Sequence, residues 1–177
     1  MPRLASLVLA ATFVAAGAGV SSAEVVLQSV HWQIGRVEGG RVASWQDVRA
    51  LTRELKSGDR LRARLILKND GAGAEEGLLL RYSLVARVVP EDGAPEGSWA
   101  VPFSVDEKRV PKVGAGKVID VPLDAGSAVD LYLRRLARAG WSPDRLKIQV
   151  MLEPHRGCKV LQTVEDVLEI GSGAKKP

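Results

Sequence analysis

Imidazole and thiol groups, which serve much of nucleophilic and metal chemistry, are scarce in this sequence. Its 177 residues include one cysteine and two histidines. His155 and Cys158 lie close together in an expected exposed turn, but two ligands do not make a four-ligand zinc site. His31 is expected at the surface, on the strand face opposite Trp32. We therefore expect no metal, no cofactor and no catalytic residue, while Cys158 is either free or paired between chains.

Acidic residues occur as neighbouring pairs, a second pattern that could do chemistry. The pairs are Glu75-Glu76, Glu91-Asp92, Asp106-Glu107 and Glu165-Asp166. Neighbours on a strand point to opposite faces, so such pairs cannot converge as the carboxylates of a glycosidase must. Three of the pairs are expected in loops, with solubility and edge protection as their roles. Ser172 and Lys175 have the Ser-x-x-Lys spacing of some acyl-transfer enzymes, but they lie in an expected disordered tail. We therefore expect a protein that is not an enzyme.

Basic side chains form the one surface pattern with the chemistry to bind a ligand. Arg60, Arg62 and Arg64 alternate with apolar residues and so fall on one face of an expected strand. Such a row of long side chains could bind the carboxylates or phosphates of an anionic polymer. The alternative is a solvated sheet face whose arginines pair with acidic residues on adjacent strands. Arg134, Arg135 and Arg138, in an expected helix, present the same choice.

The four tryptophans could bind a sugar or could anchor the fold. They are Trp32, Trp45, Trp99 and Trp141. We expect them to be core or loop anchors rather than a sugar-binding platform. Trp141 follows the expected end of a helix, where packing would fix the return of the chain to a sheet.

The first 23 residues differ in composition from the rest. Arg3 is followed by a run rich in Ala, Leu and Val over residues 4–20, and Ser21-Ser22-Ala23 ends it. This pattern is typical of a secretory signal peptide cleaved after Ala23, with an uncleaved anchor helix as the alternative. We expect a periplasmic or secreted protein without a transmembrane span after cleavage, one domain over residues 24–170 and a disordered tail over 171–177.

The overall composition is that of a globular domain. The chain is 46% hydrophobic and 26% charged, which excludes a disordered or collagen-like protein. Its formal charge is +4 with both signs interleaved, so the balance does not demand nucleic acid, and we expect no nucleic-acid partner. A lone cysteine cannot form an intramolecular disulfide, so stability must come from the core.

Alternation of apolar and polar residues predicts about seven strands. The segments are 26–34, 60–68, 78–89, 99–105, 118–123, 146–153 and 160–170. In the first strand, Val26 is expected on the same face as Trp32. Pro102 lacks a backbone N–H and predicts a sheet edge or a bulge. The alternation slips at Glu165-Asp166, which predicts a bulge there.

Two segments have helical spacing. A helix is predicted over 127–139, with Ser127 as its N-cap and Gly140 as its stop. Residues 44–55 fit either a helix or a strand. Many short strands with one or two inserted helices predict an all-β fold of two packed antiparallel sheets, with a small barrel as the alternative.

Three segments carry a resemblance to a known family. They are Lys56-Ser57-Gly58-Asp59-Arg60-Leu61, Leu67-Lys68-Asn69-Asp70-Gly71 and Val113-Gly114-Ala115-Gly116-Lys117-Val118. Over about residues 56–123 the chain resembles the bacterial immunoglobulin-like domains of cell-surface and adhesion-related proteins. The resemblance implies a single immunoglobulin-like β-sandwich and a non-catalytic binding or structural module. The helix at 127–139 and the solitary domain depart from the pattern.

The leading hypothesis is an exported, non-enzymatic protein that binds or supports another envelope or secreted macromolecule through strand edges and loops. One alternative is a protease inhibitor or periplasmic chaperone that acts through an edge strand. A second alternative is a hydrolase with an unrecognised site, marked by a deep pocket near His31 or His155 lined by acids. Binding of an anionic polymer through Arg60, Arg62 and Arg64 can accompany the first hypothesis.

Overall fold

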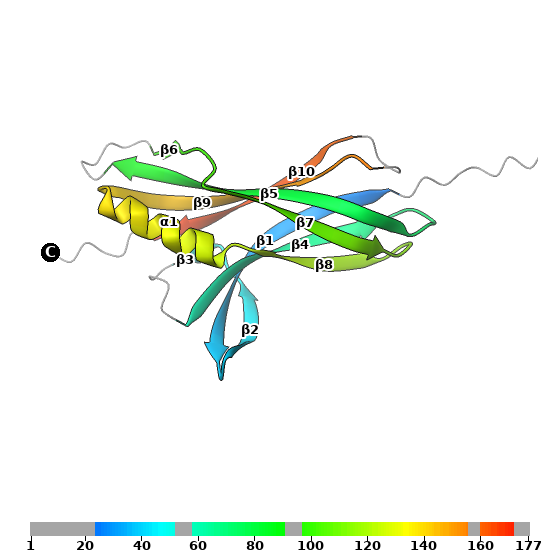
Figure 1. Cartoon of the computed structure of the whole chain (residues 1–177), viewed down its shortest axis with the longest axis horizontal. Coiled ribbons are helices and arrows are strands. Elements are labelled where there is room, and N and C mark those ends of the chain that lie inside the picture. The colour runs from blue at the N-terminus through cyan, green and yellow to red at the C-terminus, as the bar shows by residue number, and fades with distance from the viewer. Residues whose placement is uncertain (1–23, 52–57, 91–96, 156–159, 172–177) are drawn as a thin grey trace, which may run out of the picture.

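The described part of the protein consists of two β-sheets and one helix. The structure, a computed structural model, describes residues 24–51, 58–90, 97–155 and 160–171. The four-stranded sheet consists, in spatial order, of β2 (Arg41–Asp47), β1 (Val25–Glu38), β4 (Asp59–Asn69) and β8 (Val118–Asp124). The second sheet runs from β3 (Ala50–Leu51) through β10 (Gln162–Ile170) and β9 (Trp141–Leu152) to β5 (Glu75–Pro90). Both β6 (Ser98–Trp99) and β7 (Ser104–Val113) pair with β5. Among the strands in these ranges, only β3 and β10 pair in parallel (Figure 1).

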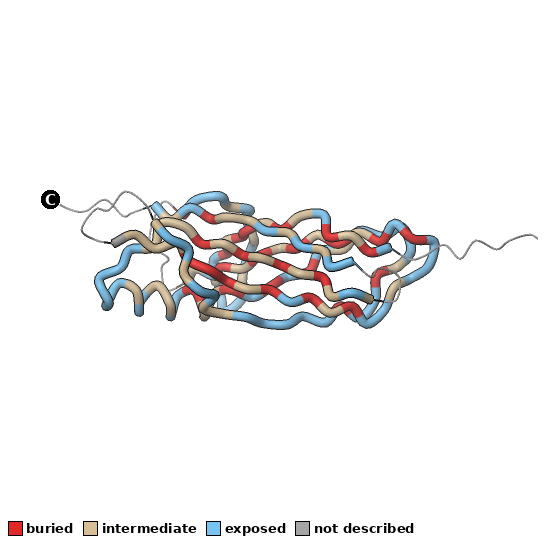
Figure 2. The backbone as a smooth tube through the Cα atoms, turned by 90° about the horizontal axis from the view of Figure 1, so that it is seen from above, coloured by how far each residue is buried: buried red, intermediate tan, exposed pale blue. Residues whose placement is uncertain are grey.

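One hydrophobic core lies between the two sheets. In β4 the predicted alternation holds, because Leu61, Ala63, Leu65 and Leu67 are buried while the arginines between them face outward. The inward residues of β5 and β9 join the same core. Buried positions alternate with exposed ones along the strands (Figure 2). The predicted all-β class is therefore confirmed as two packed, mostly antiparallel sheets.

The first strand contains a bulge that the sequence analysis missed. The pairing of β1 with β4 shifts after Leu27. Val25 and Leu27 point into the core before the shift, and Trp32 does so after it. Val26 therefore lies on the opposite face, and its predicted placement with Trp32 is wrong.

The predicted strand at 99–105 is interrupted, as its proline implied. β6 and β7 both follow the edge of β5, and between them the Ala100 N–H donates to the Ala86 carbonyl at 2.9 Å. Pro102 lies in the gap between these two strands. The prediction of a sheet edge or bulge is confirmed. β7 extends through residues 106–113, where exposed charges obscure the alternation.

The expected bulge in the last strand is wrong. β10 pairs with β9 continuously from Gln162 to Glu169. Asp166 occupies an inward-facing position between Val164 and Leu168. A polar residue on the core side interrupts the alternation of apolar and polar residues in the same way that a bulge would.

The acidic pairs in the described ranges lie in strands, not loops. They belong to β5, β7 and β10, and Glu91-Asp92 lies outside the described residues. One carboxylate of each pair bonds to a neighbouring strand: Glu76 to Lys112 at 2.9 Å, Glu107 to Arg81 at 2.9 Å and Glu165 to Lys147 at 3.6 Å. These contacts join neighbouring strands through opposite charges.

The predicted helix is α1 (Gly126–Arg138), and it ends as expected at Gly140, whose φ is +76°. Ala125, not Ser127, is the N-cap, and its side chain cannot bond the helix. Tyr132 stacks on Phe103 with ring centroids 4.1 Å apart, which fixes the helix beside the sheet. No helix in the described part of the chain has the length and apolarity needed to cross a bilayer.

The ambiguous segment 44–55 is not helical where the structure describes it. Its residues up to 47 belong to β2, and 50–51 form β3. Residues 52–57 lie outside the described ranges, as do the expected signal peptide, Cys158 and the tail from residue 172.

Candidate binding site

One long side of the two-sheet body lacks a paired strand. β2 pairs with β1 only from Gln33 onward, and β3 pairs only with Glu169 and Ile170 of β10. Within the described ranges, residues 25–32 of β1 and 162–168 of β10 therefore each have one edge without a neighbouring strand. These two edges face each other, and we call them the open side.

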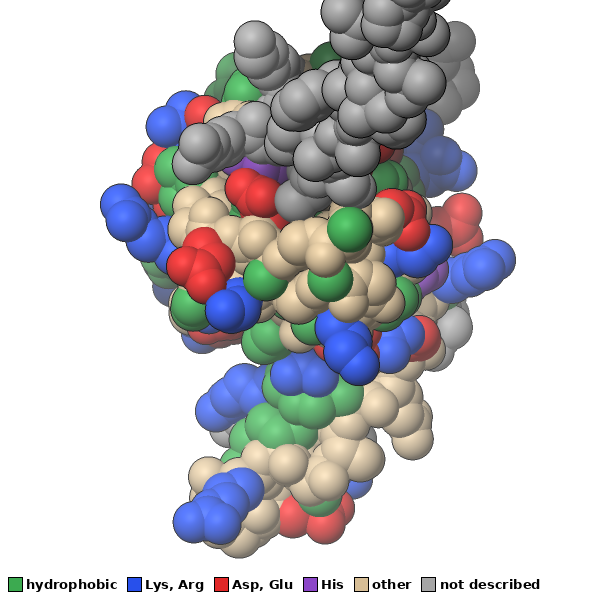
Figure 3. All heavy atoms as spheres, turned by 90° about the vertical axis from the view of Figure 1, so that its right-hand side faces the viewer, with side chains coloured by type: hydrophobic (Ala, Val, Ile, Leu, Met, Phe, Trp, Pro, Cys, Tyr) green, Lys and Arg blue, Asp and Glu red, His purple; other side chains and the backbone are tan. Residues whose placement is uncertain are grey.

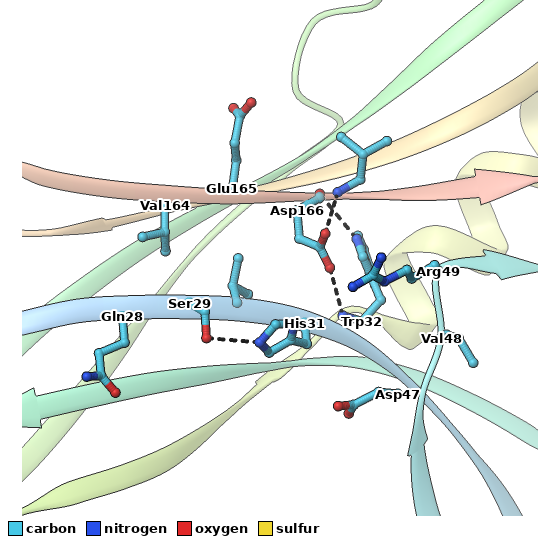
Figure 4. A pocket seen from close by; sticks show the side chains of 12 residues that line it. Gln28, Ser29, His31, Trp32, Asp47, Val48, Arg49, Val164, Glu165 and Asp166 are labelled. Carbon is cyan, nitrogen blue, oxygen red and sulfur yellow. Dashed lines mark hydrogen bonds between the residues drawn. The ribbon is translucent and has the colours of Figure 1, made fainter.

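The chain between β2 and β3 crosses the open side at one end. The Val48 N–H donates to the Trp32 carbonyl, and the Glu169 N–H donates to the Arg49 carbonyl, both at 2.9 Å. Beside this crossing lies a hollow of about 1020 Å³ lined by β1, β10 and residues 47–49 (Figure 4). Its volume is in the range of ligand sites, and its length follows two strand edges.

Side chains of β10 take the place of a strand beside β1. The Leu27 N–H donates to Gln162 Oε1 at 2.9 Å, and Gln162 Nε2 donates to the Val25 carbonyl at 2.8 Å. The Trp32 N–H donates to Asp166 Oδ2 at 3.2 Å, while Trp32 Nε1 donates to the Asp166 carbonyl at 3.3 Å (Figure 4). The backbone groups of β1 are thus satisfied by side chains that rotation could remove.

The hollow contains a serine and histidine pair. His31 Nε2 and Ser29 Oγ share a hydrogen bond of 2.9 Å, and the lining includes Asp47, Glu165 and Asp166. His31 is half-exposed at the rim of the hollow, in line with its expected surface position. The expected mark of a hydrolase is a deep pocket near His31 or His155 lined by acids; this hollow has the acids beside His31, but it is a half-open groove.

His155 differs from its predicted exposed position. It is half-buried, its Nδ1 lies 3.3 Å from the Glu153 carbonyl, and its Nε2 has no hydrogen-bond partner among the described residues. Among those residues there is also no group of three or more His, Asp or Glu side chains placed to hold a metal.

The predicted arginine row lies on the outer face of β4, where Arg62 is held by its neighbours. Its guanidinium lies 3.8 Å from the Trp45 ring centroid, and its Nε donates to Gln33 Oε1 at 2.8 Å. Gln33 in turn donates to Asp47 at 2.7 Å. Burial and then the charge of Arg64 lower the pKa of Arg62, which stays charged at neutral pH.

The other two arginines of the row differ from each other. Arg64 bonds to Asp47 at 3.0 Å and lies 3.6 Å from Asp120, so it joins β4 to strands on both sides. The Arg60 side chain is exposed, and its one hydrogen bond to a described residue goes to the Asp59 carbonyl at 3.0 Å. Arg62 and Arg64 therefore have partners on adjacent strands, as the alternative interpretation of the row expected. Only the Arg60 side chain of the row is available to a ligand.

The four tryptophans differ in burial. Trp32 is fully buried and Trp45 is half-buried beneath Arg62. Trp99 and Trp141 remain 41% and 42% exposed, so neither lies in the core. Lys147 Nζ lies 4.8 Å from the Trp99 ring centroid.

The opposite long side, between β7 and β8, is built differently. The Tyr82 hydroxyl lies 3.2 Å from both Asp106 Oδ2 on β7 and the Asp124 carbonyl on β8. Burial, followed by the charge of Asp106, raises the pKa of Tyr82 to about 12. A core tyrosine thus joins the two edges, and we call this the closed side.

Sequence reasoning missed the open side because its lining comes from three distant segments. Alternation identifies each strand, but it does not reveal which edges lack a neighbour. No protein-family model matches the chain, and no curated protein matches it significantly. Geometry alone therefore has to indicate the function.

Proposed function

We propose that this protein is an exported, non-enzymatic binding module that accepts an extended segment of another envelope or secreted protein at the open side. The observation that carries the proposal is the unpaired edge of β1 beside a hollow of about 1020 Å³. An added strand would bond to backbone groups that Gln162 and Asp166 now satisfy. Strand addition of this kind gives affinity through main-chain bonds and specificity through alternate side chains.

The order of the strands supports an immunoglobulin-like sandwich as the scaffold. Strands β1, β4 and β8 correspond in connectivity to A, B and E, whereas β5, β9 and β10 correspond to C, F and G. β7 lies beside β5, where a C′ strand would lie. In this proposal β2, β3 and β6 are additions to the immunoglobulin-like strands. Because β2 pairs with only part of β1, and β3 with only part of β10, the edges of strands A and G stay open.

The composition of the edges also favours the open side. Exposed edge strands are usually protected by charges or proline. β7 has Pro111 and four consecutive charged residues, and β8 has Pro122. Residues 25–32 of β1 contain no proline and no Asp, Glu, Lys or Arg. The β1 edge is therefore the one best suited to accept a strand.

A protease inhibitor or periplasmic chaperone is the second candidate, since it would use the same edge. The identity of the bound segment separates the two: a folded envelope partner supports a structural role, and an unfolded client or a trapped protease supports this alternative. A hydrolase is less well supported. Ser29 and His31 are in contact, but no described residue bonds Nδ1 of His31 to orient it.

The test combines capture of a partner with mapping of its site. The purified protein is incubated with envelope and secreted fractions, and hydrogen exchange is then measured on the complex. We expect slower amide exchange in residues 25–32 and 162–168 upon binding, with no change in 104–113.

A matched pair of variants makes the test specific. Ser29→Arg places a long charged side chain at the open side, and Ser104→Arg does the same on the edge strand β7. We expect the first to lose the partner and the second to retain it. Retention by Ser29→Arg, or protection of residues 104–113, would contradict the proposal.

A further inference from the structure

A second hollow lies beneath the hairpin formed by β1 and β2. The far end of this hairpin projects from the body, as Figure 1 shows. Seen from the end of the molecule, it displays apolar side chains next to basic ones (Figure 3). Between the hairpin and strands β4, β7 and β8 is a space of about 620 Å³. A volume of this size suits one small molecule.

The hollow has apolar walls on two sides. The hairpin contributes Val37, Val42 and Trp45, and the body contributes Leu61, Pro122 and Leu123. Trp45 is held in place by Arg62, whose guanidinium covers one face of the indole. An apolar ligand group would thus meet a wall fixed before binding, which lowers the entropic cost of association.

The carboxylates that line the hollow already have partners within the protein. Glu107 bonds to Arg81 at 2.9 Å, and Asp124 Oδ1 accepts from the Gly126 N–H at 3.1 Å. Asp106 accepts from the Tyr82 hydroxyl and from the Glu107 N–H. Glu107 is thus paired with a cation, whereas Asp106 and Asp124 are held in place by neutral donors.

The cations at the same hollow are less engaged. Among the described residues, the Arg60 side chain bonds only to the neighbouring Asp59 carbonyl, and the Lys108 side chain forms no hydrogen bond or ion pair. Both are exposed. They come from β4 and β7, on two different sheets, and neither side chain is paired with a carboxylate of the described residues, so both can bind an anion at the rim of the hollow.

We propose that this hollow binds a small amphiphilic anion, namely a carboxylate on an alkyl chain. Arg60 and Lys108 bind the carboxylate, and the alkyl chain lies against the hairpin wall and Leu61. Arginine pairs well with carboxylates because its donors match their geometry. This site is separate from the open side, so it stands or falls independently of the strand-binding role.

The test uses three probes and titration calorimetry on the full chain at low ionic strength. Decanoate has both groups, acetate lacks the chain, and decyltrimethylammonium has the chain with the opposite charge. We expect decanoate to bind at least about tenfold more tightly than either control, because only decanoate satisfies both the cations and the apolar wall.

Variants then identify the cations. The double variant Arg60→Gln/Lys108→Gln is expected to weaken decanoate binding by about fivefold to twentyfold, the range for two partly screened charge contacts. The control is Arg135→Gln/Arg138→Gln, which removes two exposed arginines from α1. Absence of decanoate binding, equal binding of decyltrimethylammonium, or an unchanged affinity in the first double variant would overturn the proposal.

Discussion

The two long sides of this protein show two ways to end a sheet. On the closed side, the edge strands contain Pro111 and Pro122, and a core tyrosine joins them through its hydroxyl. On the open side, the side chains of Gln162 and Asp166 occupy the positions of a missing strand. A proline removes a backbone donor that an added strand would need, whereas a side chain can rotate away. The difference therefore separates permanent protection from removable protection.

The largest effect is expected from the residue that joins β1 to β10. Trp32 is fully buried and donates two hydrogen bonds to Asp166. Trp32→Ala should lower the free energy of unfolding by about 4 kcal/mol, through a cavity and a lost bond. Leu123→Ala on the closed side should cost about 3 kcal/mol. Urea denaturation followed by circular dichroism measures the free energy of unfolding of both variants. A smaller decrease for Trp32→Ala than for Leu123→Ala would show that the open side contributes less to stability than its packing suggests.

The next effect concerns self-association. Inward polar residues on an edge strand oppose pairing with other chains. Gln162→Val/Asp166→Val removes them and should raise the mass in solution about twofold relative to the wild type, through pairing of free edges. The control Thr163→Val/Glu165→Val alters the outward face of the same strand. Analytical sedimentation measures the mass of each variant in solution. Equal masses for the two double variants would contradict the idea that Gln162 and Asp166 prevent self-association.

A moderate effect is expected on the closed side. Tyr82→Phe should lower the free energy of unfolding by about 1 kcal/mol near pH 8, since one hydrogen bond is lost. The pKa of Tyr82 is raised to about 12 in the folded state, so the folded protein holds this proton more tightly than the unfolded chain does. Its stabilising contribution is present below pH 10 and is lost as the pH rises from 10 to 12.

Denaturant midpoints measured across that range test the assignment. The wild type should lose its advantage over Tyr82→Phe between pH 10 and 12, because the variant has no proton to release at this position. A constant difference across this range would mean that the hydroxyl does not join the two edges.

The smallest effect should come from the exposed ion pair on β7. Lys112 and Glu76 are 2.9 Å apart, but both are mostly exposed to solvent. Exposed pairs contribute little because water and salt screen them. Lys112→Gln should leave the melting temperature unchanged within error in a thermal scan. A clear decrease would indicate that the closed side depends on surface charge as well as on Tyr82.

Local patterns predicted the elements well where one rule operated alone. In β4, strict alternation placed Leu65 inward and Arg64 outward, and the stop at Gly140 was predicted from its freedom to adopt positive φ. Local patterns are misleading where one residue meets two structural requirements. Asp166 faces the core but bonds to the edge of β1, so its position looked like a bulge.

The candidate sites were harder to predict because they are formed between strands. The period of two identified the arginine row, but the partners of Arg62 and Arg64 lie on β1, β2 and β8. Nothing in the spacing of Lys108 linked it to Arg60. These relations depend on strand order, which long-range packing determines and local propensity does not.

The bond between Leu27 and Gln162 has a consequence for how the molecule folds. These residues are 135 positions apart, so almost the entire chain must be present before this contact can form. Folds dominated by such distant pairings fold slowly, because loop entropy is lost before contacts compensate for it. The first strand therefore has to wait for the last one, and during that time its edge is accessible to any other extended chain nearby.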